Sequence, residues 1–534
     1  MSASQDKKKR NQQRAEGTER RQVASAKAAQ EKKKSRVKWI VGSIVVVLLV
    51  AFIIVGNSNL FYTAQKAVKI GDQRYSVAEM NYEYMSVYNQ YNQYAQYFGD
   101  VSPKAEYTMD ETYKTWDDFY KAQAVQSLAR KEALVALAEQ NGVKLTDEEI
   151  KQVDDLLASY ADAAKQYGYA NVDKFITANF GNGVTKKLAR ELMLRDALAD
   201  KYVQYYQDNL TFTDDQLAAE YAANKDEYDN YSFQYYVVEA ETTQSTDADG
   251  NVTTTASAES MAAAKEVAEQ IKAATAGDAG SFADAVGQYG KPVEQEVTDE
   301  QGVAVTDEQG NPVTETTTAE PVASEKTQGS SITEYGMPFG DWVKDAARVQ
   351  GEVEIFEQEN VGYYVVLFEG RDDNSGLTVN VRHILIQAED TDGDGTYSEE
   401  ELAAAKAKIE EIKAEYDAGE QTEDAFAALA NQYSTDPGSN TNGGLYENVV
   451  EGQMVEEFNN WCFDAARQPG DVGIVEDAAY NGYHLMYFVG SGESNQNVIA
   501  RNALTSEALS AFESSLTADL KYDDLFAMRY VGVK

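Results

Sequence analysis

Both histidines of this 534-residue chain lie in its last third, in two segments with the pattern of strands. His383 lies in VRHILI, where period-two alternation places its side chain on one face with Val381 and Leu385. His484 lies in GYHLMYF, on one face with Met486. If these strands pair in one sheet, the two rings meet and can hold a defined hydrogen-bond network. The alternative is two core histidines that only satisfy hydrogen bonds. We favour the network, because the only two histidines of the chain fall at paired positions.

The chain repeats one unit, and the histidines occur only in its second copy. The segment FGDWVKDAARVQGEVEIFEQENVGYYVVLFEG parallels FNNWCFDAARQPGDVGIVEDAAYNGYHLMYFVG. Residues 231–371 and 377–491 are therefore predicted to be two tandem α/β units, each of them an α+β or α/β sandwich. Tyr235 and Tyr364 replace the histidines in the first copy, which indicates a degenerate unit. An acidic, Thr-rich insertion at about 291–330 predicts a flexible surface segment.

The second copy resembles a parvulin-type (PpiC-like) peptidyl-prolyl isomerase domain. The matching pieces, in family order, are VRHILI, ALANQYS, STDPGS, NGGL, GQMVEEF and GYHLMYF. The resemblance implies that the two central histidines of the family fall on His383 and His484, and its acidic position on Asp436. The apolar residues that cradle the proline ring fall on Leu445, Met454 and Phe458. The loop after the two glycines departs from the family, because it lacks the usual Asp-Leu-Gly sequence.

These residue types suit the isomerisation of a prolyl bond. Rotation about that bond faces a barrier of roughly 18–20 kcal/mol, because twisting destroys amide resonance. No covalent bond breaks, so neither a nucleophile nor a cofactor is required. An apolar pocket at Met454 and Phe458 can hold the ring and exclude water, while a polar network lies beside the carbonyl. The alternative for these two side chains is plain core packing on one helix face.

A second motif in the same unit matches a calcium loop. DTDGDGTYSEEE, from Asp390 to Glu401, has its glycine at the sixth position and its glutamate at the twelfth. A strand rather than a helix leads into it, so a paired EF-hand is not implied. The alternative is an acidic, solvated loop whose carboxylates favour the start of the following helix.

The amino-terminal region predicts a membrane anchor. Residues 1–38 are rich in Lys and Arg, and residues 39–56 form an uncharged apolar run long enough to span the ~30 Å core of a bilayer. The positive-inside rule then keeps the amino terminus in the cytoplasm and places residues 57–534 outside, as a single-pass protein of the cell membrane. The alternative is a cleaved signal peptide, but no A-x-A site follows closely. The formal net charge of −42 would repel phosphate and argues against nucleic acid.

The remaining segments predict helices. Residues 66–225 have helix-period apolar positions, with a capping-box pattern at Thr146 and Glu149, and the tail at 492–534 holds one helical segment that could pack back on them. With the anchor, the chain resembles the PrsA, SurA and PpiD group of secretion foldases. The resemblance implies an α+β multidomain fold with a helical chaperone domain, and unfolded or nascent exported polypeptides as partners. The alternative is a non-enzymatic holdase that uses parvulin-like folds to bind peptides. The only cysteine, Cys462, excludes an intrachain disulfide, and the oligomeric state is not encoded in any motif.

Overall fold

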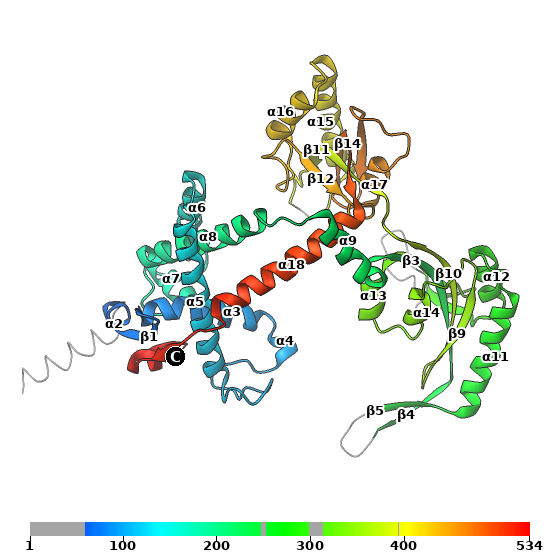
Figure 1. Cartoon of the computed structure of the whole chain (residues 1–534), viewed down its shortest axis with the longest axis horizontal. Coiled ribbons are helices and arrows are strands. Elements are labelled where there is room, and N and C mark those ends of the chain that lie inside the picture. Colours follow the sequence, from blue (N-terminus) through cyan, green and yellow to red (C-terminus); the bar gives the residue numbers. More distant parts are fainter. Residues whose placement is uncertain (1–58, 247–251, 298–312, 394, 534) are drawn as a thin grey trace, which may run out of the picture. The chain divides into compact units, whose positions relative to one another are not determined.

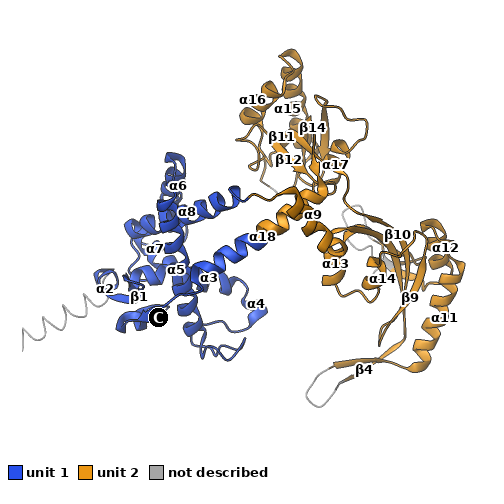
Figure 2. Cartoon of the chain, viewed as in Figure 1, with its two compact units in different colours: residues 1–210, 507–534 blue, residues 211–506 orange. Residues whose placement is uncertain are grey.

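The computed structural model describes residues 59–246, 252–297, 313–393 and 395–533. The basic tail and the predicted membrane span at residues 39–56 lie outside these residues. In the described part, no helix combines the length and the apolar character that crossing a membrane requires. The chain divides into two compact units, residues 1–210 with 507–534 and residues 211–506 (Figure 2).

The first unit is a helical domain with one small sheet. Its helices are α2 (Asn59–Ala64), α3 (Val77–Gln93), α4 (Ala95–Phe98), α5 (Trp116–Gln140), α6 (Asp147–Gln166), α7 (Val172–Phe180), α8 (Lys186–Asp208) and the 3-10 helix η1 (Phe526–Tyr530). At the start of α6, Glu149 accepts a hydrogen bond from the backbone N–H of Thr146 at 2.6 Å, which confirms the predicted capping box.

The small sheet joins the two ends of the described chain. It contains β1 (Lys66–Ile70), β2 (Gln73–Ser76) and β15 (Tyr522–Asp524), in the order β15-β1-β2. The helical prediction missed these strands. They are short, and β15 pairs with a strand more than 400 residues earlier, which no local pattern reveals.

The tail helix α18 (Asn495–Thr517) packs on the helices of the first unit through its last turns. Phe512 stacks on Tyr206 with ring centroids 4.0 Å apart, and Glu513 pairs with Arg130. This packing agrees with the contact predicted for the tail. The division between units falls after Leu210, so α9 (Asp214–Ala223) and α10 (Lys225–Tyr228) belong to the second unit.

The first copy of the repeat forms a four-stranded antiparallel sheet in the order β8-β3-β10-β9. The strands of the sheet are β3 (Asn230–Glu239), β8 (Val322–Gln328), β9 (Val353–Gln358) and β10 (Gly362–Asp372). Its helices are α11 (Ala258–Ala274), α12 (Ala279–Tyr289), α13 (Gly329–Glu334) and α14 (Gly340–Lys344). Two further antiparallel ladders are β4 (Thr242–Thr246) with β5 (Val252–Ala256) and β6 (Val293–Glu296) with β7 (Thr314–Thr317).

The prediction of a flexible segment across 291–330 was wrong for its last part. β8 pairs with β3 and forms one edge of the sheet. Its polar sequence, VASEKTQ, concealed the strand, because an edge strand is held by its backbone ladder and needs little apolar surface. The repeated VTDEQG motif lies mostly outside the described residues.

The second copy has a sheet with the same strand order, β12-β11-β14-β13. In Figure 1 this copy is the part of the chain that contains β11, β12 and β14 with α15, α16 and α17. Its elements are β11 (Leu377–Gln387), α15 (Glu399–Ala418), α16 (Glu423–Tyr433), β12 (Leu445–Val449), α17 (Glu456–Cys462), β13 (Val472–Asp477) and β14 (Gly482–Ser494). All its ladders are antiparallel, so each copy is α+β rather than α/β. Two separate apolar clusters cover the two faces of the sheet, one with α15 and α16 and the other with α17.

Candidate active site

His383 and His484 lie on the two central strands of the second sheet. β11 and β14 pair so that Leu385 is opposite His484, which places the two histidines diagonally on the face covered by α17. Their Nδ1 atoms are 2.9 Å apart. The two residues are only 3% and 5% exposed. The structure therefore brings the two predicted rings together, beneath the surface.

The Nε2 atom of each histidine ring lies next to a carboxylate. His383 Nε2 is 2.8 Å from Asp436 Oδ2 and 3.1 Å from Ser439 Oγ. His484 Nε2 is 2.7 Å from Asp477 Oδ2, and the side chain of Asp477 is completely buried. Asp436, His383, His484 and Asp477 thus form a continuous row joined by three hydrogen bonds. We call these four residues the Asp-His-His-Asp row.

Several hydrogen-bond donors surround Asp436 and favour its ionised form. It follows α16, and its Oδ2 also accepts hydrogen bonds from the hydroxyls of Ser439 and Tyr446, the latter at 3.1 Å. The hydrogen bond from His383 is the largest cause that lowers the pKa of Asp436 far below its usual value, although burial opposes it. A stable negative charge therefore lies at the outer end of the row.

The surroundings of His484 disfavour its imidazolium form. Burial is the largest cause that lowers its pKa, and the nearby charge of His383 lowers it further. The hydrogen bond with Asp477 acts in the opposite direction. These effects disfavour a state in which both rings are imidazolium at once.

An aromatic ring closes the site above the histidines. Phe458 on α17 is 2% exposed, and its ring centroid lies 5.5 Å from that of His383 and 5.4 Å from that of His484, both in edge-to-face geometry. Met454 is half-buried and packs on the same cluster as Phe458. Phe458 therefore lies beside the histidines, as the resemblance implied, whereas Met454 precedes α17 and does not share a helix face with Phe458.

Leu445 does not lie with them. It pairs with Arg382, whose side chain bonds to Glu423 of α16 at 2.9 Å, so alternation puts Leu445 on the opposite face of the sheet from His383. The next residue, Tyr446, occupies the histidine face, with its ring centroid 5.3 Å from that of His383. The prediction for Leu445 was wrong by one residue because a one-residue change of register reverses the face.

The glycine pair before Leu445 fixes this register. Gly444 has φ +73°, and its carbonyl oxygen accepts a hydrogen bond from the N–H of His383 at 2.8 Å. A Cβ at Gly444 would lie 2.2 Å from the carbonyl oxygen of His383. Only glycine permits so close an approach of the two backbones, so the turn positions Tyr446 and β12 against β11.

Two family models match the chain. A PPIC-type PPIASE domain matches residues 350–489, and a SurA-like N-terminal domain matches residues 27–156. The chain is homologous to PrsA foldases and SurA chaperones. The PPIC-type match contains all four residues of the Asp-His-His-Asp row.

Curated relatives agree with this homology. Foldase protein PrsA 1 of Listeria innocua is 28% identical over 229 residues, which are 38% of this chain and 70% of that protein. Chaperone SurA of Alkalilimnicola ehrlichii is 35% identical over 139 residues, 26% of this chain and 29% of SurA. The crystal structure of PrsA from Bacillus anthracis is 20% identical, covers 30% of this chain and 64% of its own, and has a TM-score of 0.17. The crystal structure of PrsA from Bacillus subtilis is 14% identical, and the match covers 78% of this chain and 92% of that PrsA chain, with a TM-score of 0.26.

The first parvulin-like copy has an aromatic cluster in place of the histidine pair. The rings of Tyr235 and Tyr364 are 5.9 Å apart. Phe339 lies 5.5 Å from Tyr235 and 5.6 Å from Tyr364, much as Phe458 lies over the histidines of the second copy. The architecture of the site is therefore retained, while its ring nitrogens are lost.

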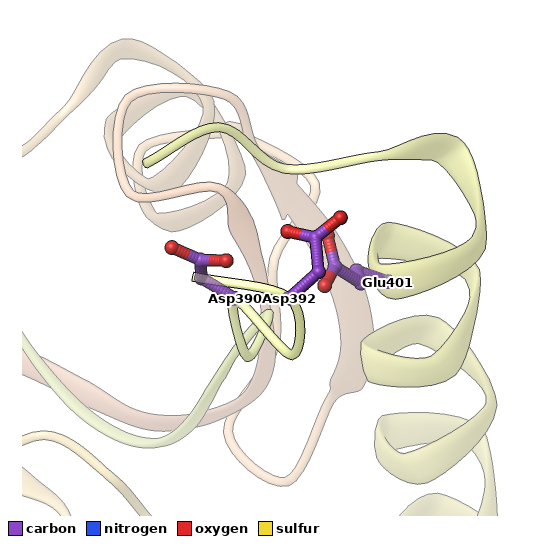
Figure 3. A group of neighbouring side chains, drawn as sticks. All are labelled: Asp390, Asp392 and Glu401. Atoms are coloured by element: carbon purple, nitrogen blue, oxygen red, sulfur yellow. The ribbon is translucent and has the colours of Figure 1, made fainter. Parts of the chain in front are cut away.

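The predicted calcium loop brings three carboxylates together. Asp390, Asp392 and Glu401 each offer an oxygen atom, and these atoms lie within 4.8 Å of one another (Figure 3). The two oxygens of Glu401 already accept hydrogen bonds from Thr391 and Ser398, which hold the start of α15. The carboxylates at the described positions suit a hard cation such as Ca²⁺. Asp394 lies outside the described residues, and calcium binding stays a prediction.

Three polar residues of the site escaped the sequence analysis. Ser439 and Tyr446 lie in the loop and strand after Asp436, and the alternation of LYENV would have indicated Tyr446 once the register was known. Asp477 could not have been found in this way. It meets His484 only because the β13–β14 hairpin pairs Asp477 with Gly482.

Proposed function

We propose that the second parvulin copy is an active peptidyl-prolyl cis-trans isomerase, in a chain that assists the folding of exported proteins. One observation carries the proposal. A hydrogen-bonded row of two carboxylates and two imidazoles lies against the ring of Phe458, and Met454 packs on the same apolar cluster as Phe458. A hydrophobic core has no need of such a row, because burying four ionisable groups costs free energy.

The geometry suits catalysis without covalent chemistry. The planar amide is more polar than the twisted one, so water stabilises the ground state more than the transition state. Met454 and Tyr446, which are half-buried, can contact the proline ring and its peptide, exclude water and thereby favour the twisted amide, whereas Phe458 is as buried as the histidines. The histidines are too buried to surround a peptide, so they act by orienting the groups above them.

The row below gives these contact groups a fixed position. Asp436 forms hydrogen bonds with the hydroxyl of Tyr446 and with Nε2 of His383. The ring of Phe458 packs in edge-to-face geometry against both histidine rings. A prearranged site does not need to reorganise as the peptide bond rotates. This arrangement is the physical reason to expect that removing one ring changes the rate rather than only the fold.

The substrates and the location follow from the homology and from charge. We propose unfolded or nascent exported polypeptides as clients, because the chain has a SurA-like N-terminal domain and PrsA relatives. We propose that residues 39–56 anchor the chain in the cell membrane with residues 57–534 outside. The acidic net charge disfavours nucleic acid as a partner.

The alternative is a holdase that binds peptides and isomerises nothing. The first copy, with Tyr235 and Tyr364 in place of histidines, favours that role for itself. The two functions differ in stoichiometry. An isomerase accelerates many clients in turn, whereas a holdase must occupy each client chain.

The test is the refolding of a client protein whose slow phase is prolyl isomerisation. We expect the full chain to accelerate that phase at a small fraction of the client concentration. His383→Ala should abolish the acceleration, while Tyr235→Ala, the matched change in the first copy, should retain it. Suppression of client aggregation without any acceleration by the folded wild type would replace the isomerase with the holdase.

A further inference from the structure

Asp477 is a completely buried carboxylate at the inner end of the row. It is the last residue of β13, and its Oδ2 lies 2.7 Å from His484 Nε2. Its Oδ1 accepts a hydrogen bond from the backbone N–H of Tyr480 at 3.0 Å. Among the described residues, no lysine or arginine forms an ion pair with it. A buried charge of this kind is costly unless a proton on its partner compensates it.

Counting hydrogens shows how many protons the row holds. If Asp436 and Asp477 are both ionised, each can only accept a hydrogen bond, and the Nε2 atoms of His383 and His484 must then each carry a hydrogen to bond to them. The two Nδ1 atoms lie 2.9 Å apart, so one of them must carry a third hydrogen. Without it, two lone pairs would face each other. Two neutral imidazoles have only two ring hydrogens, and the row therefore requires one more proton.

A second extra proton has no place in the row. It would put a hydrogen on both Nδ1 atoms at a separation of 2.9 Å and a positive charge on both buried rings. The charged and titratable groups around His484 are His383 from β11, Asp436 from the loop after α16, and Asp477 from β13. Two carboxylates and one shared proton give these four groups a net charge of −1.

The first copy provides an internal comparison. Gln358 is the last residue of β9 and lies opposite Gly362, just as Asp477 is the last residue of β13 and lies opposite Gly482. Gln358 is exposed. The copy that has tyrosines in place of both histidines thus also lacks the buried acid, although it keeps the hairpin. A carboxylate needed only to shape the turn would be expected in both copies.

We propose that Asp477 is a positioning residue of the isomerase site, which holds His484 with its Nε2 protonated, so that the histidine pair carries one shared extra proton. This inference rests on the proposed isomerase function. Through the Nδ1 contact, Asp477 fixes the orientation of His383 and hence of Asp436, although it lies on the far side of the row from Asp436. Asp477 itself is too deeply buried to touch a peptide.

The ring protons can be observed directly. The chain has only two histidines, so the full chain labelled with [15N]histidine has four ring nitrogens, and long-range 1H–15N spectra can assign each of them. We expect three protonated nitrogens near neutral pH, with both Nε2 atoms among them. Two protonated nitrogens, or an unprotonated Nε2 on His484, would overturn the inference. This measurement needs no variant.

A pair of variants tests the role in catalysis. Asp477→Asn keeps an oxygen for the Tyr480 N–H but removes the charge, and Glu476→Gln makes the same change of charge at the adjacent exposed position. We expect Asp477→Asn to lose the third ring hydrogen and to lower kcat/KM about tenfold or more, with an altered pH profile. A loss of this size is typical when the carboxylate that orients a metal-binding histidine is removed. Glu476→Gln should leave the number of ring hydrogens, kcat/KM and the pH profile unchanged. If Asp477→Asn, folded by circular dichroism, keeps the wild-type rate and pH profile, the positioning role is refuted.

The outcomes separate this inference from the proposed function. An inactive wild type with three protonated nitrogens would refute the isomerase and leave the proton count intact. An active wild type with only two protonated ring nitrogens would refute the role of Asp477 and leave the isomerase function intact.

Discussion

Asp436→Asn should be one of the most damaging conservative changes in the site. The carboxylate accepts hydrogen bonds from His383 Nε2 at 2.8 Å, from the Tyr446 hydroxyl at 3.1 Å and from the Ser439 hydroxyl. Asparagine has nearly the same shape but no charge, and its amide group donates where the carboxylate accepted. The variant therefore retains the fold while it weakens the contacts that hold the row and Tyr446 in place.

The expected loss follows from these contacts. A hydrogen bond to a charged group contributes about 1.5–3 kcal/mol, and one between neutral groups about 0.5–1.5 kcal/mol. Loss of the charge should thus cost about 1 kcal/mol for each of two or three bonds, or about 2–3 kcal/mol in total. If the full amount appears in the transition state, kcat/KM falls about 30- to 160-fold.

The assay is prolyl isomerisation of a short peptide, measured as kcat/KM. Asp464→Asn is the matched control, because Asp464 is an exposed acid of the same domain whose ion pair is the 3.7 Å contact with Arg467. The control should stay within about twofold of the wild type, since exposed ion pairs contribute little. If Asp436→Asn also stays within that range while its circular dichroism is unchanged, the reasoning about the ionised carboxylate is refuted.

Three further predictions concern other parts of the chain. Changing both Tyr235 and Tyr364 to histidine should leave the isomerase rate of the chain unchanged in the peptide assay, because the first copy would still have Gln358 in place of the buried carboxylate Asp477. A gain in rate would contradict this. Hydrogen bonds from Thr391 and Ser398 lower the pKa of Glu401 from about 4.5 to about 2, so its stabilising effect should be complete above pH ~4.5 and be lost as the pH falls towards 2. Thermal unfolding followed against pH should then show a smaller acid-induced drop in Tm for Glu401→Gln, and equal drops would rule this out. Calorimetric titration with Ca²⁺ should release or absorb heat that Asp392→Ala removes, and the calcium hypothesis ends if the two titrations agree.

The sequence predicted the elements of the site that depend on local patterns. The helical spacing predicted for Met454 and Phe458 was wrong, because α17 begins only at Glu456, although Met454 still packs on the cluster that contains Phe458. Alternation along two strands placed His383 and His484 correctly. These positions follow from the backbone period alone. The repeat was equally visible, and the two sheets have the same strand order.

Features that depend on pairing between distant segments could not be predicted. The face occupied by Leu445 or Tyr446 depends on the register of β12 against β11, which the Gly444 backbone contact sets. Asp477 reaches His484 through a hairpin register, and β15 reaches β1 across most of the chain. In each case the decisive contact is a backbone ladder, whose partners leave no signal in either segment taken alone.

The central claim, that the second copy isomerises prolyl bonds, is tested most directly by exchange spectroscopy on a peptide that contains one X-Pro bond. Uncatalysed exchange takes tens to hundreds of seconds, so a mixing time below about one second gives no cross-peak between the cis and trans forms. We expect cross-peaks when a small amount of the full chain is added, and their loss with His383→Ala. A folded wild-type chain that produces no cross-peak would contradict it.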